Sequence, residues 1–213
     1  MSTICERFHH LFAQQRRFIF PFDEYKIPRN GIYVLFEKGE TGHGTDRVVR
    51  IGTHTGENQL RSRLKQHFLK ENKDRSIFRK NIGRALLHGD GDPFLQQWNL
   101  DLTTRKAKNE YVDAIDWDKQ KATEHRVSSY IQSHFTFVVI KVVEKARRLE
   151  LESRLTSTVS LCDDCGPSAA WLGLSSPKQK IRESGLWQVN ELYKRACSEA
   201  DLAEVRRWLS VGD

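Results

Sequence analysis

Five side chains, far apart in the sequence, have the types needed to break a phosphodiester bond. That reaction needs an attacking oxygen, a group that takes its proton, and positive charge for the transition state. One divalent ion can supply part of that charge and assist the leaving oxygen. The candidates are one tyrosine, two arginines, one histidine and one glutamate, at Tyr33, Arg50, Arg63, His67 and Glu152.

Each candidate suits a different task. Glu152 can hold Mg²⁺ or Mn²⁺, because hard cations prefer carboxylate oxygens. Arg63 can form two parallel hydrogen bonds to phosphate oxygens and stays protonated at any working pH. Tyr33 can position or deprotonate water where nearby cations stabilise its phenolate. His67 can bond the phosphate or a tyrosine, or relay a proton.

The spacing of these residues predicts the elements that carry them. Residues 31–36 and 48–52 are rich in β-branched and aromatic types, which predicts two strands joined by a glycine-rich, flexible tip over 37–46. Leu60, Leu64 and Phe68 mark the apolar face of a helix on which Arg63 and His67 share another face. Glu152 falls on a helix over 145–160, where Glu150 competes for the metal but faces another side.

The remaining pattern predicts an α+β fold with a small, mainly antiparallel three-stranded sheet flanked by helices. The third strand is expected at 135–143, and further helices at 3–18, 82–87, 122–133, 178–197 and 199–209. We expect one domain over residues 1–176, with an N-terminal helix and an insertion at about 78–121. Residues 177–213 would form a helical extension packed on the same domain.

The order of these elements resembles that of the GIY-YIG nuclease family. Gly31-Ile32-Tyr33 matches the first half of the family's name, and Arg50-Ile51-Gly52 matches the last two residues of the second half. The segment 60–68 is similar to the family's Arg-x-x-x-His-Phe helix, and 149–155 resembles the helix whose acidic residue holds the metal. The resemblance implies that Tyr33 is the general base and Glu152 the metal ligand.

Two positions depart from the family pattern. Arg50 stands where the family has its second tyrosine, and an arginine can contact phosphate but cannot act as a base. His54 could supply the lost proton transfer, although a polar loop residue is the simpler interpretation. The family also has an asparagine after the metal helix, for which only Ser168 lies at a plausible distance.

The charge of the chain favours a polyanionic partner. There are 35 lysines and arginines against 28 aspartates and glutamates, a net charge of +7 and a pI near 9.3. Such a balance raises the association rate with nucleic acids without proving that they bind. Candidate nucleic-acid contacts, most of them in a basic segment beside the candidate helix, are Arg47, His54, Arg61, Lys65, Lys70, Lys73, Arg79 and Lys80.

Composition and cysteine usage indicate a globular cytoplasmic protein. Apolar runs such as residues 137–140 are too short to cross a bilayer, and residues 1–15 have no signal-peptide core. Cys162 and Cys165 form a C-x-x-C pair without a second pair or a nearby histidine at ligand spacing. We therefore interpret them as two loop residues in a reducing compartment rather than as a zinc site or a redox dithiol.

The favoured hypothesis is a divalent-metal endonuclease that acts on double-stranded DNA. A homodimer is compatible with this hypothesis. It would be either restriction-like or associated with repair or mobile elements. The departures at Arg50 and at the late asparagine support a non-catalytic DNA-binding module as the alternative. An RNA-binding or RNA-processing protein is the third hypothesis, because a basic surface does not choose between nucleic acids.

Overall fold

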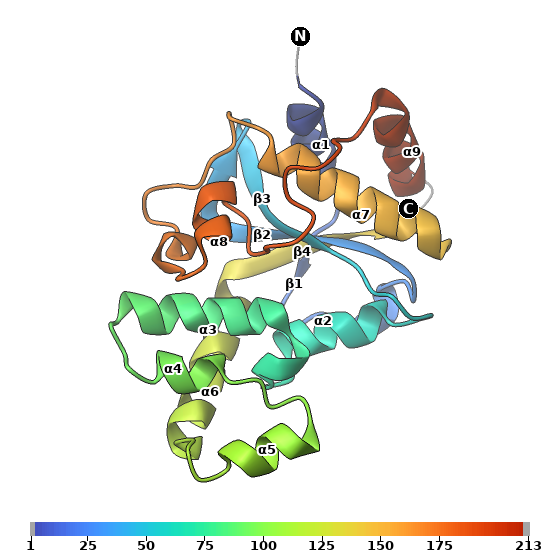
Figure 1. Cartoon of the computed structure of the whole chain (residues 1–213). Coiled ribbons are helices and arrows are strands. Elements are labelled where there is room, and N and C mark those ends of the chain that lie inside the picture. Colours follow the sequence, from blue (N-terminus) through green and yellow to red (C-terminus); the bar gives the residue numbers. More distant parts are fainter. Residues whose placement is uncertain (1–2, 211–213) are drawn as a thin grey trace.

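A four-stranded antiparallel sheet lies between two layers of helices in the computed structural model, which describes residues 3–210 (Figure 1). The strand order is β1 (Phe18–Ile19), β4 (Phe135–Lys141), β2 (Gly31–Gly42) and β3 (Thr45–Gly52). The predicted α+β class is confirmed. The sheet has one strand more than predicted, because the two residues of β1 pair with β4 at Phe137 and Thr136.

The β2–β3 hairpin is longer than the sequence suggested. Residues expected to form a flexible tip remain paired, since Thr41 lies opposite Asp46 and Gly42 opposite Thr45. Only His43 and Gly44 form the turn, with φ of 54° and 73°. A two-residue hairpin turn of type I′ needs positive φ at both positions, which glycine adopts freely and histidine tolerates. The glycines at 39, 42 and 44 therefore mark strand and turn rather than a long loop.

Side chains of β2 alternate between the two helical layers. Ile32, Val34 and Phe36 point to a core that α1 (Ile4–Ala13), α7 (Lys145–Ser160) and α9 (Glu199–Ser210) cover. Tyr33 and Leu35 point to the opposite core, under α2 (Leu60–Phe68), α3 (Ile77–Gly89) and α6 (Trp117–His134). The strand thus places Tyr33 on the side of α2, where the predicted Arg63 and His67 lie.

The predicted insertion and C-terminal extension differ in detail from the structure. α3 begins at the predicted start of the insertion and buries Phe78 and Ile82 in the core, whereas α5 (Arg105–Tyr111) buries no side chain. Between them lies α4 (Leu95–Asn99). The helix expected over 178–197 is only α8 (Gln179–Ser184), which ends at Gly185 with φ of 66°. Residues 1–2 and 211–213 of the predicted units lie outside the described residues.

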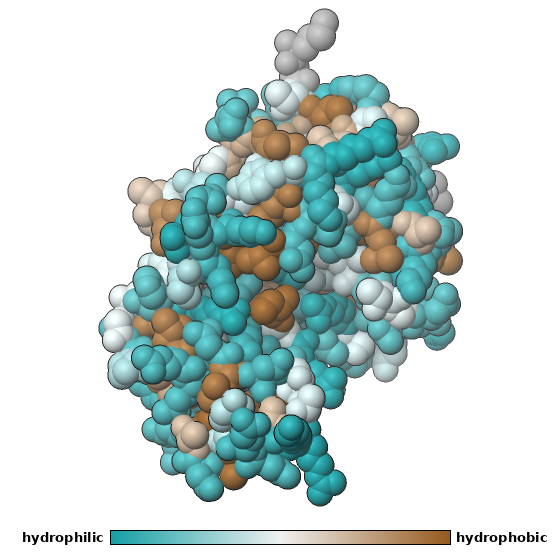
Figure 2. All heavy atoms as spheres, in the orientation of Figure 1, coloured by the Kyte–Doolittle hydropathy of each residue, from teal (hydrophilic) through white to brown (hydrophobic). Residues whose placement is uncertain are grey.

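No helix among residues 3–210 is long and apolar enough to cross a membrane. The face in Figure 2 is mostly hydrophilic, with hydrophobic side chains gathered near its centre.

A buried carboxylate fastens the chain after α7 to the sheet. Glu37 Oε2 accepts hydrogen bonds from Nε1 of Trp171 and Nε1 of Trp187, each at 2.7 Å. Glu37 Oε1 accepts a third from the hydroxyl of Tyr130 on α6. Burial raises the pKa of Glu37, while these three donors favour its charged form. Both tryptophans are therefore anchors and not free stacking surfaces.

Replacing Glu37 with alanine should leave two buried indole N–H groups without an acceptor. We expect the free energy of unfolding to fall by about 2–5 kcal/mol, measured by urea denaturation. Glu37→Gln should recover most of this loss, because its amide oxygen can accept from both indoles. The exposed control Glu110→Ala should change little. Equal loss in Glu37→Gln and Glu37→Ala would contradict the proposed role of the acceptor oxygen.

Candidate active site

A buried chain of hydrogen bonds joins Tyr33, His67 and Ser76. The Tyr33 hydroxyl lies 2.7 Å from His67 Nε2, and His67 Nδ1 lies 2.7 Å from Ser76 Oγ. Ser76 is also the N-cap of α3, where its Oγ accepts from the Arg79 amide. Strand β2 and helices α2 and α3 thus fix the direction of one phenol. The two predicted residues Tyr33 and His67 are in direct contact.

His67 is a neutral imidazole in this environment. Complete burial lowers its pKa well below the ordinary value, and the charges of Arg63, Arg50 and Arg79 lower it further. Its single proton can sit on either nitrogen. In one tautomer His67 accepts the Tyr33 proton, and in the other it donates to the Tyr33 oxygen.

Gly52 makes room for the tyrosine ring. It lies opposite Tyr33 in the β2–β3 register, and a Cβ at this position would be 2.3 Å from the Tyr33 hydroxyl oxygen. Gly31 has a similar constraint, because a Cβ there would be 2.3 Å from the Ile140 carbonyl oxygen. The two motif glycines are therefore required by close contacts on neighbouring strands.

Arg50, which replaces the second tyrosine of the family, faces the same side of the sheet. It is almost fully buried, donates to the Trp187 carbonyl, and its guanidinium carbon lies 5.3 Å from the Phe78 ring centroid. Its Nε has no hydrogen-bond partner within residues 3–210. A buried, unpartnered N–H group has a high affinity for an acceptor such as a phosphate oxygen.

Glu152 extends from α7 towards the same arginines. Burial raises the pKa of this carboxyl to about 7, and the charges of Arg50 and Arg63 partly oppose the shift. Because Arg50 and Arg63 act on both Glu152 and His67, the structure brings the predicted set to one region at the edge strand β3. A half-buried carboxyl with a raised pKa is well suited to a divalent cation, which would stabilise its charged form.

The competing acid, Glu150, has other partners. It is exposed, and it forms ion pairs with Arg147 at 2.8 Å and with Arg154. Two residues along a helix are about 200° apart, so the two carboxyls point to different sides of α7. Glu152 is therefore the acid that faces Arg50 and Arg63.

Arg63 is the most accessible cation of the set. It is partly exposed on α2, and its Nη1 donates to the Arg75 carbonyl at 3.0 Å and to Gln66 Oε1 at 3.2 Å. These bonds orient the guanidinium and leave its Nη2 available for a phosphate.

Most predicted nucleic-acid contacts lie inside the fold. Arg47 pairs with Glu40 and Arg79 with Glu124, and both side chains have no exposed surface. Lys73 and Lys80 share Asp74. These cations stabilise buried carboxylates, so they are not offered to a polyanion, and the basic run in the sequence is in large part internal.

His54 is also internal. Its Nε2 accepts from the Gly31 amide at 3.3 Å, and its Nδ1 lies 2.7 Å from the Gly56 carbonyl oxygen. The ring positions the start of β2, and both nitrogens are occupied by the backbone. Of the eight predicted contacts, the ones left with exposed surface are Arg61, Lys65 and Lys70.

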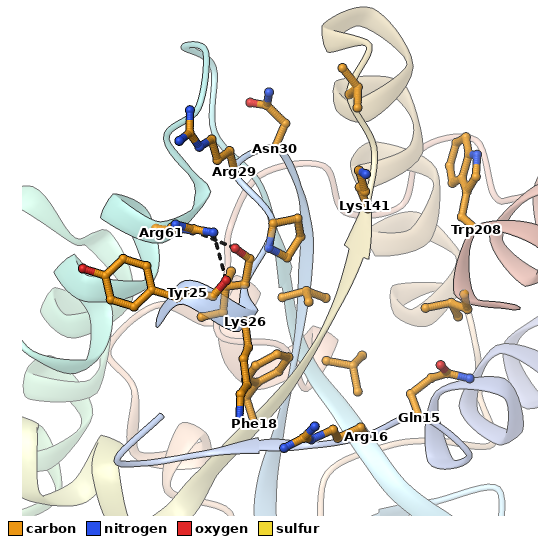
Figure 3. A pocket seen from close by; sticks show the side chains of 16 residues that line it. Gln15, Arg16, Phe18, Tyr25, Lys26, Arg29, Asn30, Arg61, Lys141 and Trp208 are labelled. Atoms are coloured by element: carbon orange, nitrogen blue, oxygen red, sulfur yellow. Dashed lines mark hydrogen bonds between the residues drawn. The ribbon is translucent and has the colours of Figure 1, made fainter. Parts of the chain in front are cut away.

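A basic hollow of about 970 Å³ lies beside the start of β2 (Figure 3). Its lining contains no acidic residue, and Arg61 on its wall donates to the Ile27 and Tyr25 carbonyls. Only Arg61 of its cations had been predicted, because the others are scattered in the sequence. The five cations that line it are Arg16, Lys26, Arg29, Arg61 and Lys141.

The segment between α7 and α9 contains one predicted residue, Ser168, and two that the sequence did not identify, Asn190 and Glu191. Ser168, the substitute considered for the late asparagine, donates to Glu40 at the far end of the hairpin. Glu191 instead lies near Glu152 and raises its pKa. Ser157 on α7 donates to the Glu191 carbonyl at 2.8 Å, which holds this segment in place despite a φ of 64°. Asn190 precedes it with an exposed side chain.

The hairpin with paired motif glycines, the Arg-x-x-x-His helix and the acidic helix together define a GIY-YIG-like α+β domain. A sequence model of the GIY-YIG domain matches residues 3–209, so the chain belongs to this family of nucleases. Searches of curated proteins and of solved structures give no match.

Adding one methyl group at Gly52 should displace Tyr33. We expect Gly52→Ala to lower the free energy of unfolding by about 1–3 kcal/mol, because a rigid buried ring has no free space to move into. Urea denaturation would measure the change. Gly166→Ala is the matched control, since a Cβ there meets nothing within 4 Å. Similar stabilities for the two variants would contradict the close contact.

Proposed function

We propose that this protein is an endonuclease that hydrolyses DNA phosphodiester bonds with Mg²⁺ or Mn²⁺ bound at Glu152. The observation that carries the proposal is the half-buried Glu152 carboxyl, whose raised pKa is opposed by the charges of Arg50 and Arg63. A carboxyl held near half-ionisation can take up a cation with little change in the surrounding protein. When bound, the cation would supply charge that neutralises the scissile phosphate.

The arginines have separate proposed tasks. Arg63, partly exposed, binds the phosphate and orients it. Arg50 donates its unpartnered Nε–H to a phosphate oxygen and so takes a binding position where the family has a tyrosine. Guanidinium groups stay charged at every working pH, so both contacts persist through the reaction.

Tyr33 is the proposed base, and His67 is a positioning residue that acts through it. The phenol would orient the attacking water and accept its proton at the hydroxyl oxygen while its own proton passes to Nε2 of neutral His67, which also holds the hydroxyl in place. Ser76 in turn holds His67. Tyr33, His67 and Ser76 make this arrangement without a second tyrosine. Arg50 stands in the place of that tyrosine and is proposed to bind the phosphate.

Double-stranded DNA is the proposed substrate. The hollow lined by five cations and no acid would attract a phosphate backbone, and Lys70 adds exposed charge near α2. The replacement of the second tyrosine favours a non-catalytic binding module as the alternative. That module would bind DNA in a salt-dependent manner and cut nothing.

The proposal is tested with a plasmid-nicking assay in Mg²⁺ or Mn²⁺. We expect Glu152→Gln to lower the cleavage rate by roughly 100-fold or more, the scale of losing one main transition-state contact. Glu150→Gln is the matched control on the same helix and should stay within about twofold, because exposed ion pairs contribute little.

Single-stranded DNA and RNA should be assayed beside the plasmid. Cleavage of RNA alone would replace the proposed substrate. Absence of cleavage by the wild-type protein on every nucleic acid, together with salt-dependent DNA binding, would establish the binding module instead.

A further inference from the structure

Three cysteines and one histidine converge at the end of the hairpin away from Gly52. They are Cys5 in the first turn of α1, His43 in the β2–β3 turn, and Cys162 and Cys165 just after α7. Their ligand atoms all lie within 4.8 Å of one another. Cys5 Sγ is 3.6 Å from Cys165 Sγ, and Cys162 Sγ is 3.3 Å from His43 Nε2.

We propose that these four side chains form a structural zinc site. Zn–S bonds of about 2.3 Å and Zn–N bonds of about 2.0 Å place neighbouring ligand atoms of a tetrahedron roughly 3.5–3.8 Å apart. The two measured separations are close to this range, so small side-chain shifts would complete the coordination. Thiolate and imidazole ligands select zinc over the hard cations Mg²⁺ and Mn²⁺.

Four protein ligands leave no open position for water or substrate. The site would therefore stabilise the fold rather than catalyse a reaction. It would fasten three segments that lie far apart in the sequence, since Cys5 and Cys165 are 160 residues apart. One of these segments directly follows α7, the helix that carries Glu152.

The backbone around the cluster is shaped for close approach. His43 has positive φ in the tight turn, which projects its ring from the hairpin tip towards Cys162. Gly42 lies against the second cysteine, because a Cβ on it would be 3.0 Å from Cys165 Cβ. A larger residue at this position would push the C-x-x-C loop away from the turn.

A buried histidine supports one ligand from behind. His9 Nε2 accepts from the Val48 amide at 3.2 Å, so its proton is on Nδ1. That nitrogen donates to the Cys5 carbonyl at 2.9 Å and lies 3.6 Å from Cys5 Sγ. Hydrogen bonds of this kind orient the ligands of metal sites.

The sequence alone led us to interpret the C-x-x-C pair as two ordinary loop thiols. With the cluster, the pair would instead supply two of four zinc ligands. A second pair is absent from the sequence, but Cys5 and His43 supply the missing two ligands from distant segments. A disulfide between Cys5 and Cys165 is the other chemistry available to the cluster, and it would need the sulfurs to approach from 3.6 Å to about 2.05 Å.

Metal content of untagged, gel-filtered protein tests the proposal. Elemental analysis should find about one zinc per chain in the wild type, and Cys165→Ser and His43→Ala should lose it. Cys197→Ser is the matched control, because Cys197 is a buried cysteine outside the cluster. Glu152→Gln should keep its zinc, which separates this site from the proposed catalytic metal.

A spectroscopic measurement on the wild-type protein tests the proposal even where the variants fail to fold. Cobalt substituted into the wild-type protein should show the strong visible bands of a tetrahedral ion and a thiolate charge-transfer band. His43→Cys should retain metal, with a charge-transfer band enlarged by a fourth thiolate. Wild-type protein that contains no zinc and takes up neither zinc nor cobalt, or that carries a Cys5–Cys165 disulfide, would overturn the proposal.

Discussion

The candidate site depends on one half-buried carboxyl group, that of Glu152, next to two arginines. Desolvation raises the pKa of this acid to about 7, against the opposing charges of Arg50 and Arg63. The position requires α7, the edge strand β3 and helix α2 to meet. Packing on both faces of the sheet is therefore needed to place three charges that the sequence holds far apart.

The β2–β3 hairpin connects this site to the thiol cluster. At one end, a Cβ at Gly52 would meet the Tyr33 ring, and a Cβ at Gly31 would meet the Ile140 carbonyl. At the other end, His43 meets the C-x-x-C loop. Helix α7 connects the same two regions, since it carries Glu152 and ends at Ser160, two residues before Cys162. A metal at the cluster would restrain both elements that present the proposed catalytic groups, and broad chelation would then affect fold and the proposed activity together.

The sequence revealed the features that depend on local periodicity. The spacing of Arg63 and His67 placed them on one face of a helix, and the α+β class followed from the alternation of patterns. Features set by pairing across the chain were hidden. The sequence could not show that Arg47 and Arg79 are neutralised by Glu40 and Glu124, since each pair forms only after the elements pack. Cys5 and His43 were missed as ligands for the same reason. The helix predicted over 178–197 was too long, because helical spacing does not reveal where tertiary packing ends a helix.

Proton release on metal binding is the most direct test of the role of Glu152. Mn²⁺ should be titrated into protein already loaded with zinc, by calorimetry in buffers of different ionisation enthalpy. Because the pKa of Glu152 is raised to about 7, the carboxyl is largely protonated at about pH 6 and ionised at about pH 8.5. Binding should therefore release close to one proton at the lower pH and almost none at the higher pH, with weaker affinity at the lower pH. Equal affinity and proton release at the two pH values, or unchanged binding by Glu152→Gln, would contradict the account.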